Sequence, residues 1–200
     1  MQGIAERPEN PGGVMFHFSG AFEDEFFSVT AYRDGQSSAQ MFADYTGPEV
    51  ESAIRTSGER ADINRLEFPI TRYAVRDDED LQGYSRKEPG EMVAVYATAA
   101  TFSRERYLKI TGEAGFPDDW PEGLVIHVAG EFGNRWGIFD VWHADSDLLS
   151  FYRDRIEAAV ATVAKDIEGG VMDQPKSIAL HSLYVNRGTF EDIREYLREE

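Results

Sequence analysis

The chain contains an internal repeat, and this repeat constrains the fold more than any other feature. The stretch Gly123–Trp142 (GLVIHVAGEFGNRWGIFDVW) aligns without a gap with Gly13–Tyr32 (GVMFHFSGAFEDEFFSVTAY) at a constant offset of 110 residues. The identical pairs are Gly13/Gly123, His17/His127, Gly20/Gly130 and Phe22/Phe132. A repeat at so long a spacing is a duplicated domain-sized unit rather than a solenoid module. The chain is therefore predicted to consist of two related halves that pack on each other.

The second half is predicted to have the strand–helix–strand–strand–helix–strand order of a ferredoxin-like fold. Runs rich in β-branched and aromatic residues predict strands, and apolar residues three and four apart predict helices. The predicted elements are a strand over Met92–Thr98, a helix with Ser103 as its N-cap, the hairpin within Gly123–Trp142, a helix over Asp147–Ile167 and a strand over Ile178–Val185.

The first half is predicted to be an incomplete copy of this unit. A hairpin is expected over Val14–Ser19 and Phe26–Arg33, a broken helix between residues 36 and 58, and a strand over Leu66–Val75, in which Pro69 favours an edge or bulge position. No opening strand or helix precedes them. A C-terminal helix over Thr189–Arg198 is expected either to fill the place of the missing helix or to cover a sheet edge. The predicted division is therefore an N-terminal half (1–78), a linker (79–90), a C-terminal half (91–186) and a C-terminal helix that packs on the N-terminal half (187–200).

Composition excludes several classes of partner. The formal net charge is −17 and the isoelectric point is near 4.6, which argues against nucleic acid and anionic membrane surfaces. The sequence contains no cysteine, so disulfides, thiolate catalysis and cysteine-based metal sites are excluded. No apolar run approaches the length of a membrane span, and the N-terminal residues do not have the pattern of a signal peptide. A cytoplasmic location is therefore expected.

Two segments of the second half resemble a known family. The strand GLVIHVAG, with its central histidine and closing glycine, and the segment RWGIFDVWHADSDLLSFYRDRI are similar to the antibiotic biosynthesis monooxygenase-like family of dimeric α+β barrels. The resemblance covers Met92–Val185 well and Gly13–Val75 loosely. It implies an α+β fold in which the sheets of two ferredoxin-like units pair into a barrel. Because two units lie in one chain here, it implies an intramolecular pseudo-dimeric α+β barrel.

Strand alternation predicts which face of the second hairpin lines a cavity. One face is wholly apolar and is predicted to pack on the helices: Leu124, Ile126, Val128, Phe139 and Val141. The other face mixes apolar residues with two ionisable ones: Val125, His127, Ala129, Trp136, Ile138, Asp140 and Trp142. In the family, the barrel interior is the sheet face away from the helices. The resemblance therefore implies that the second face lines the cavity.

His127 and Asp140 are the candidate catalytic residues. In an antiparallel hairpin they lie opposite or diagonal to each other, within side-chain reach. A carboxylate orients an imidazole and raises its basicity, so the pair is a candidate general base. The first half keeps His17 but has Thr30 at the position of Asp140. The alternative is a buried His–Asp pair that only satisfies its own hydrogen bonds.

The candidate substrate-binding residues are apolar and aromatic side chains that would stack on a flat substrate; they are Tyr96, Val125, Trp136, Ile138, Trp142 and His17. The four histidines lack the HxH, HxxxH or HExxH spacing of metal ligands, so no metal site is expected. No nucleotide-binding motif is present either, and no cofactor is expected. Haem binding stays open, because one histidine in an apolar pocket would suffice as its ligand.

The family combines cofactor-free oxygenases of polyketide quinone pathways, haem-degrading enzymes and cyclases. The resemblance, together with the His127–Asp140 pair, therefore implies a cofactor-independent enzyme of secondary metabolism, either an oxygenase or a cyclase/isomerase. It would remove a proton from a hydrophobic aromatic or polyketide-type substrate. The alternative is a non-catalytic protein that binds hydrophobic small molecules or acts in a stress response. The expected partner is a hydrophobic small molecule, and the expected assembly is a monomeric pseudo-dimer or a homodimer.

Overall fold

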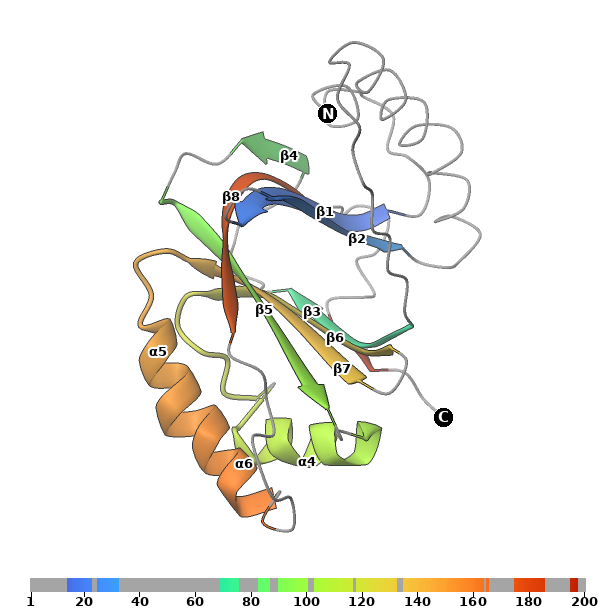
Figure 1. The fold of residues 1–200 in the computed structure, drawn as a ribbon, viewed down its shortest axis with the longest axis vertical. Coiled ribbons are helices and arrows are strands. Elements are labelled where there is room, and N and C mark those ends of the chain that lie inside the picture. Colours follow the sequence, from blue (N-terminus) through green and yellow to red (C-terminus); the bar gives the residue numbers. More distant parts are fainter. Residues whose placement is uncertain are drawn as a thin grey trace.

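A computed structural model describes residues 14–22, 25–32, 69–75, 83–86, 90–100, 103–116, 118–132, 135–163, 165, 175–185 and 195–197. These residues form an α+β fold, in which a curled antiparallel sheet carries two helices on one side (Figure 1). The strand order in the sheet is β2-β1-β8-β5-β7-β6-β3-β9, and β4 pairs with β8 off this path.

The second half has the predicted element order. Its elements are β5 (Met92–Ala100), α4 (Arg104–Glu113), β6 (Leu124–Phe132), β7 (Arg135–His143), a helix made of α5 (Leu148–Phe151), the π-helical η2 (Tyr152–Glu157) and α6 (Ala158–Val163), and β8 (Lys176–Val185). The four strands pair in the order β8-β5-β7-β6, and all pairs are antiparallel. The strand–helix–strand–strand–helix–strand prediction is confirmed for this half.

Side-chain caps fix where the two helices begin. The Ser103 side chain accepts a hydrogen bond of 3.2 Å from the backbone N–H of Arg106, which confirms the predicted N-cap of α4. Asp147 accepts one of 3.1 Å from the backbone N–H of Ser150 at the start of α5. These caps satisfy amide groups that have no partner within a helix. Both helices pack on the same face of the sheet.

Within its described residues, the first half contributes three strands. They are β1 (Val14–Phe22), β2 (Glu25–Tyr32) and β3 (Ile70–Val75). The predicted hairpin is present, since β1 pairs antiparallel with β2. Strand β1 also pairs with β8, and β3 pairs with β6, so the two halves share one sheet. The predicted broken helix lies outside the described residues.

Two segments differ from the sequence prediction. The segment predicted as a linker contains a strand, β4 (Gly83–Arg86), which pairs with β8. The predicted C-terminal helix is wrong over Glu195–Leu197, which form β9 and pair antiparallel with β3. Strand β3 would otherwise offer a row of unpaired backbone groups at the sheet edge. Pairing with that edge outweighs the weak intrinsic helix preference of a short segment.

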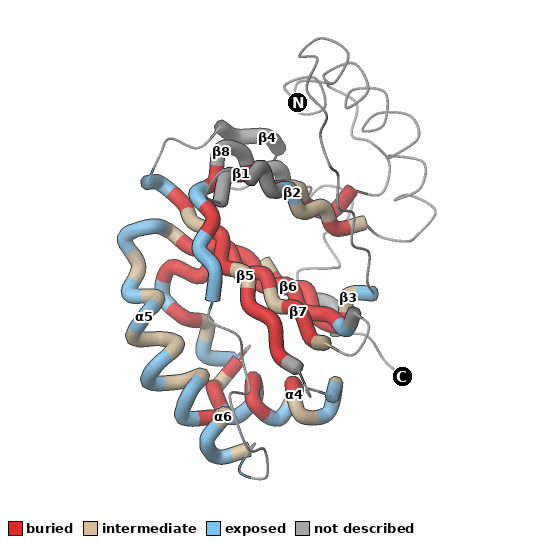
Figure 2. Tube along the Cα trace, in the orientation of Figure 1, coloured by how far each residue is buried: buried red, intermediate tan, exposed pale blue. Residues whose placement is uncertain are grey.

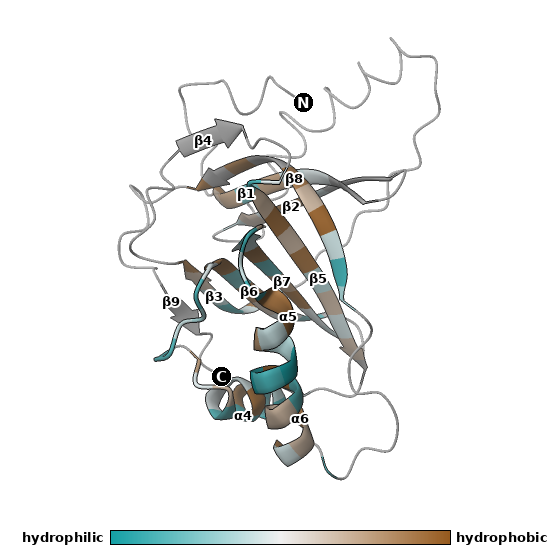
Figure 3. Ribbon diagram, turned by 90° about the vertical axis from the view of Figure 1, so that its left-hand side faces the viewer, coloured by the Kyte–Doolittle hydropathy of each residue, from teal (hydrophilic) through white to brown (hydrophobic). Residues whose placement is uncertain are grey.

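The strands at the centre of the sheet are largely buried (Figure 2). Apolar side chains pack on both faces of the sheet. On the inner face of the curl, the Phe16 ring stacks on Phe18 and on Tyr73, with centroid distances of 6.0 and 5.6 Å. On the outer face, the sheet packs against the helices through Tyr107, Trp136 and their neighbours. The strands are predominantly hydrophobic, whereas the second helix also carries hydrophilic residues (Figure 3).

Gly20→Ala is expected to destabilise the junction between the two halves. A Cβ atom at Gly20 would lie 2.2 Å from the carbonyl oxygen of Ala179 on β8. Because this neighbour is backbone, relief requires a shift of the strands, at a cost of about 3 kcal/mol in the free energy of unfolding. Chemical denaturation measures it. The control is Gly112→Ala in α4, where nothing lies within 4 Å of the added atom. Equal stabilities of the two variants would contradict the β1–β8 pairing.

Candidate active site

His127 and Asp140 form a cross-strand pair in the hairpin of β6 and β7. Their Cα atoms are partners in the β6–β7 register, and His127 Nδ1 lies 2.6 Å from Asp140 Oδ1. Both residues are buried, with exposed fractions of 6% and 3%. The predicted contact between the two side chains is therefore present. An ionised carboxylate only accepts hydrogen bonds, so Nδ1 carries the proton and donates it to Asp140.

The predicted orientation of this pair is wrong. His127 and Asp140 face the helices rather than the interior of the curled sheet, because they line a cavity together with residues of α4 and η2. A bulge in β6 between Leu124 and Ile126 changes the alternation of side chains. Leu124 consequently lines the cavity beside His127, whereas Val125 belongs to the inner core. A strand bulge shifts every side chain beyond it to the other face relative to a simple count.

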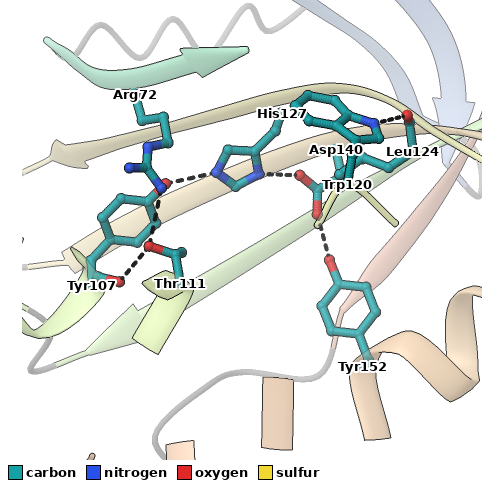
Figure 4. A network of polar contacts seen from close by, with 8 residues as sticks. All are labelled: Arg72, Tyr107, Thr111, Trp120, Leu124, His127, Asp140 and Tyr152. Atoms are coloured by element: carbon teal, nitrogen blue, oxygen red, sulfur yellow. Dashed lines mark hydrogen bonds and ion pairs between the residues drawn. The ribbon is translucent and has the colours of Figure 1, made fainter. Parts of the chain in front are cut away.

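Four side chains form one continuous hydrogen-bonded chain (Figure 4). The Tyr107 hydroxyl on α4 lies 2.7 Å from His127 Nε2. Because the His127 proton is on Nδ1 in the neutral ring, Nε2 accepts and Tyr107 donates. At the other end, the Tyr152 hydroxyl donates to Asp140 Oδ2 at 2.7 Å. The order is therefore Tyr107, His127, Asp140, Tyr152, and the chain joins both helices to the sheet.

The carboxylate end of this chain holds Tyr152 in its neutral form. Burial, the negative charge of Asp140 and the hydrogen bond to it together raise the pKa of Tyr152 well above its ordinary value. Tyr152 is the first residue of the π-helical segment η2. Such a segment inserts an extra residue into a helix and re-aims the side chains near it. Tyr152 thus donates to Oδ2 of Asp140 and leaves Oδ1 to His127.

The first half reaches into this site through Arg72 on β3. Arg72 is buried, with 6% of its surface exposed, and its Nη1 donates to the Thr111 hydroxyl at 3.2 Å. Its guanidinium carbon lies 5.9 Å from the ring centroid of Tyr107 and 5.4 Å from that of Phe116. Both distances are within the range of cation–π attraction. A positive charge therefore sits beside the tyrosine end of the chain.

A small cavity lies between the sheet and the helices along this chain. Its walls are Tyr107, Ile110, Thr111, Phe116, Leu124, His127, Ile138, Asp140, Phe151, Tyr152 and Ile156. The volume open to the centres of water molecules is about 40 Å³, and one water needs roughly 10–15 Å³ of this kind of volume. The cavity as it stands has room for a few water molecules only, and a fused-ring substrate does not fit within it.

A clamp from η2 holds the loop that follows α4. Arg155 Nε donates to the carbonyl oxygen of Ala114 at 2.8 Å, and its Nη2 donates to that of Asp119 at 2.8 Å. The loop carries Phe116, whose ring lies 4.8 Å from the His127 ring between centroids. Arg155 therefore holds the loop that carries Phe116, whose ring lies tilted beside the imidazole.

The predicted substrate-binding residues do not lie together. Ile138 lines the cavity. Trp136 and Trp142 lie on the same side of the sheet but are fully buried, against Tyr107 and Phe151 at 4.8 and 5.2 Å between ring centroids. Tyr96 lies on the inner face of the curl, where it stacks on Phe139, and Val125 is also part of that core. Of these residues, the structure thus brings Ile138 into the cavity with the His–Asp pair, whereas the two tryptophans do not line the cavity.

His17 repeats the geometry of His127 in the first half, away from the cavity. Its Cα partner is Thr30, and its Nδ1 lies 2.7 Å from the Thr30 hydroxyl. The half-buried imidazole has no carboxylate opposite it, so burial lowers its pKa from 6.5 to about 4. The repeat therefore preserves the cross-strand hydrogen bond but not the charge.

This low pKa predicts a specific pH dependence of stability. Between pH 6.5 and 4 the unfolded state binds a proton at His17 that the folded state does not bind. The free energy of unfolding should therefore fall as the pH falls through this range, by about 3 kcal/mol in total. Urea denaturation at pH 7 and pH 4 measures the change, with His17→Gln as the control. An equal loss of stability in this variant would show that His17 is not its source.

The sequence pattern does not distinguish the side chains around the histidine, which are Tyr107, Tyr152, Arg72 and Phe116. A tyrosine on the buried face of each helix is the one signal that points to this network. Among the described residues, no group of three or more histidine and acidic side chains is arranged to hold a metal ion. None of the described helices is long and apolar enough to cross a bilayer.

Comparisons with known proteins bear on the fold. No protein-family model and no curated protein matches the chain. A solved structure from Fusobacterium nucleatum subsp. nucleatum, provisionally named a monooxygenase, matches with a TM-score of 0.67 at 16% identity and covers 98% of this chain and 87% of that one. An anthrone oxidase-like protein matches with a TM-score of 0.50 at 14% identity and covers 90% and 82%. The chain therefore has the α+β fold of these structures.

Proposed function

We propose that this chain is an enzyme of the oxygenase type, which removes a proton from an organic substrate so that the resulting carbanion reacts with O₂. The observation that carries the proposal is the buried chain of Tyr107, His127 and Asp140 at the wall of a cavity. An oriented imidazole backed by a carboxylate is a suitable general base at neutral pH. Cofactor-independence is part of the proposal, since a stabilised carbanion can pass electrons to O₂ itself.

The proposed substrate has a methylene group that is made acidic by conjugation with a carbonyl. One structural neighbour is called anthrone oxidase-like, and anthrone is a tricyclic ketone whose methylene lies opposite the carbonyl in the central ring, between two aromatic rings. Oxidation of the methylene by one O₂ gives the quinone carbonyl and one water, so the reaction balances without a further reductant. Ile138, Phe151 and Ile156 are the partly exposed apolar members of the cavity wall. The rings would lie against these side chains, which must move apart to admit them.

The two halves are proposed to form an intramolecular pseudo-dimer. Two matching junctions support it: β1 pairs with β8 and β3 pairs with β6, both antiparallel. Strand β9 lies beside β3 as β5 lies beside β8, in the position of the strand that the first half lacks. One chain would then make the complete barrel. Light scattering should give a molar mass near 22.6 kDa, and a stable dimer of twice that mass would contradict this arrangement.

The test of the proposed function is oxygen consumption with anthrone as the probe. Purified protein should consume O₂ and form anthraquinone in equal amounts, faster than buffer alone does. The reaction should proceed in protein treated with a chelator and shown spectroscopically to contain no flavin or haem. If O₂ uptake with anthrone equals the buffer rate, the proposed oxidation is wrong.

A second candidate is a non-catalytic protein that binds hydrophobic small molecules. The observation that favours it is the complete satisfaction of the network: both His127 nitrogens and both Asp140 oxygens have hydrogen-bond partners within the protein. Complete satisfaction is typical of a structural network. Reversible binding of anthrone, seen as quenching of tryptophan fluorescence, together with no turnover would favour this second function.

A further inference from the structure

We propose that Tyr107 is the residue that takes the substrate proton, and that Arg72 from the first half is the positioning residue that stabilises its phenolate. This inference deepens the proposed function and rests on it. It assigns the contact with substrate to a tyrosine rather than to His127, and it makes the N-terminal half a contributor to the site of the C-terminal half.

The geometry of His127 leads to Tyr107. The imidazole is buried, Asp140 occupies Nδ1, and the Tyr107 hydroxyl occupies Nε2 at 2.7 Å. A substrate in the cavity can therefore reach the lone pair of Nε2 only by displacing Tyr107. The tyrosine ring is held against that displacement, since it stacks on Trp136 with ring centroids 4.8 Å apart. Tyr107 also lines the cavity, so its ring borders the space that a substrate would enter.

Arg72 is held beside this ring by its own contacts. Its Nη1 donates to the Thr111 hydroxyl at 3.2 Å, and that hydroxyl donates to the carbonyl of Tyr107 one helical turn earlier. The guanidinium lies over both Tyr107 and Phe116. No carboxylate among the described residues forms an ion pair with it. A phenolate spreads its charge into the ring, so a buried cation at this distance stabilises the ionised form more than the neutral one.

The two ends of the network have opposite electrostatics. The charged and titratable groups that meet here are Arg72 from β3, His127 from β6, Asp140 from β7 and Tyr152 from η2. Tyr107 faces a cation and a proton acceptor. Tyr152 faces the Asp140 carboxylate, which raises its pKa well above the ordinary value. Of the two tyrosines, Tyr107 is thus placed to ionise, whereas Tyr152 is placed to stay protonated.

The proposed step moves two protons and conserves charge. The Tyr107 hydroxyl passes its proton to His127 Nε2, which leaves a phenolate beside Arg72 and an imidazolium beside Asp140. The phenolate oxygen then forms an O–H bond with the proton of the substrate methylene, and the electron pair of the broken C–H bond stays on carbon. The carbanion is left in the cavity with the imidazolium and the guanidinium as its counter-charges. No electron leaves the substrate until O₂ reacts.

The test is a pH titration of the tyrosine rings by NMR, without any substrate. Protein labelled with ¹³C at the tyrosine Cζ is compared with Tyr107→Phe and Tyr152→Phe, which assign the two resonances. An ordinary tyrosine has a pKa of about 10, and we expect Tyr107 to ionise clearly below this pH. Tyr152 should stay neutral throughout the titration. Arg72→Met should raise the Tyr107 midpoint by about one pH unit or more, which is tenfold in the ionisation constant. Arg72→Lys, which keeps a cation, should largely restore it.

Two results would overturn the inference. One is a Tyr107 midpoint at or above the ordinary value in the wild-type protein, which decides the matter even if Arg72→Met does not fold. The other is a folded Arg72→Met protein with an unchanged midpoint. Because the titration needs no substrate, a low midpoint that depends on Arg72 supports the tyrosine–arginine pair even where anthrone is not oxidised. In that case the proposed oxidation fails and the pairing stands.

Discussion

His127→Ala is expected to lower kcat for the oxidation of anthrone by about 10²–10⁴-fold, the usual contribution of a general base. The substitution removes the acceptor of the Tyr107 proton and leaves the apolar walls of the cavity in place. An interaction used only in the transition state affects kcat more than KM. The initial rate of O₂ uptake at saturating and limiting anthrone measures both constants.

His143→Ala is the matched control for this variant. His143 is the last residue of β7 in the same hairpin, is partly exposed, and does not line the cavity. It should keep most of the wild-type rate. The assignment of His127 would be wrong if both variants retained the wild-type rate while their circular dichroism spectra remained native.

Asp140→Ala is expected to cost about 3 kcal/mol in the free energy of unfolding, the largest stability effect in the site. The Asp140 carboxylate accepts hydrogen bonds from both His127 and Tyr152. Its removal leaves two donors without their acceptor, in the space between the sheet and the second helix, and each such loss costs roughly 1–3 kcal/mol. Chemical denaturation of the two proteins at pH 7 measures the difference.

Tyr152→Phe separates the two hydrogen bonds of Asp140. It removes one donor and keeps the ring, so it should cost only about 1 kcal/mol. Equal stabilities of Asp140→Ala, Tyr152→Phe and the wild-type protein would mean that the network does not hold the second helix on the sheet. Comparison of the two variants therefore measures how much the hydrogen bonds of Asp140 contribute to the stability of the fold.

The sequence was sufficient to predict the elements around the site. The offset of 110 residues placed two hairpins in register, and the structure pairs His17 with Thr30 just as it pairs His127 with Asp140. Strand alternation and the β-branched runs predicted β1, β2, β5, β6, β7 and β8, and Ser103 marked the start of α4. These features are local, so the sequence carries them directly.

The orientation of the site could not be predicted in the same way. Because of one bulge in β6, Leu124 rather than Val125 shares a face with His127. No residue type in the sequence marks the position of this bulge. The contacts of Tyr107 and Arg72 depend on how α4 and β3 meet across the two halves. The strand β9 depends on the open edge of β3. Each is a tertiary effect that overrides a local pattern.

The most direct test of the central claim is hydrogen exchange at the substrate methylene in the absence of oxygen. Anthrone is incubated with the protein in D₂O under anaerobic conditions, and ¹H NMR follows the loss of the methylene signal. We predict exchange with wild-type protein well above the buffer rate, and exchange near the buffer rate with His127→Ala and Tyr107→Phe. Exchange at the buffer rate with wild-type protein would contradict the claim that this site removes a proton from carbon.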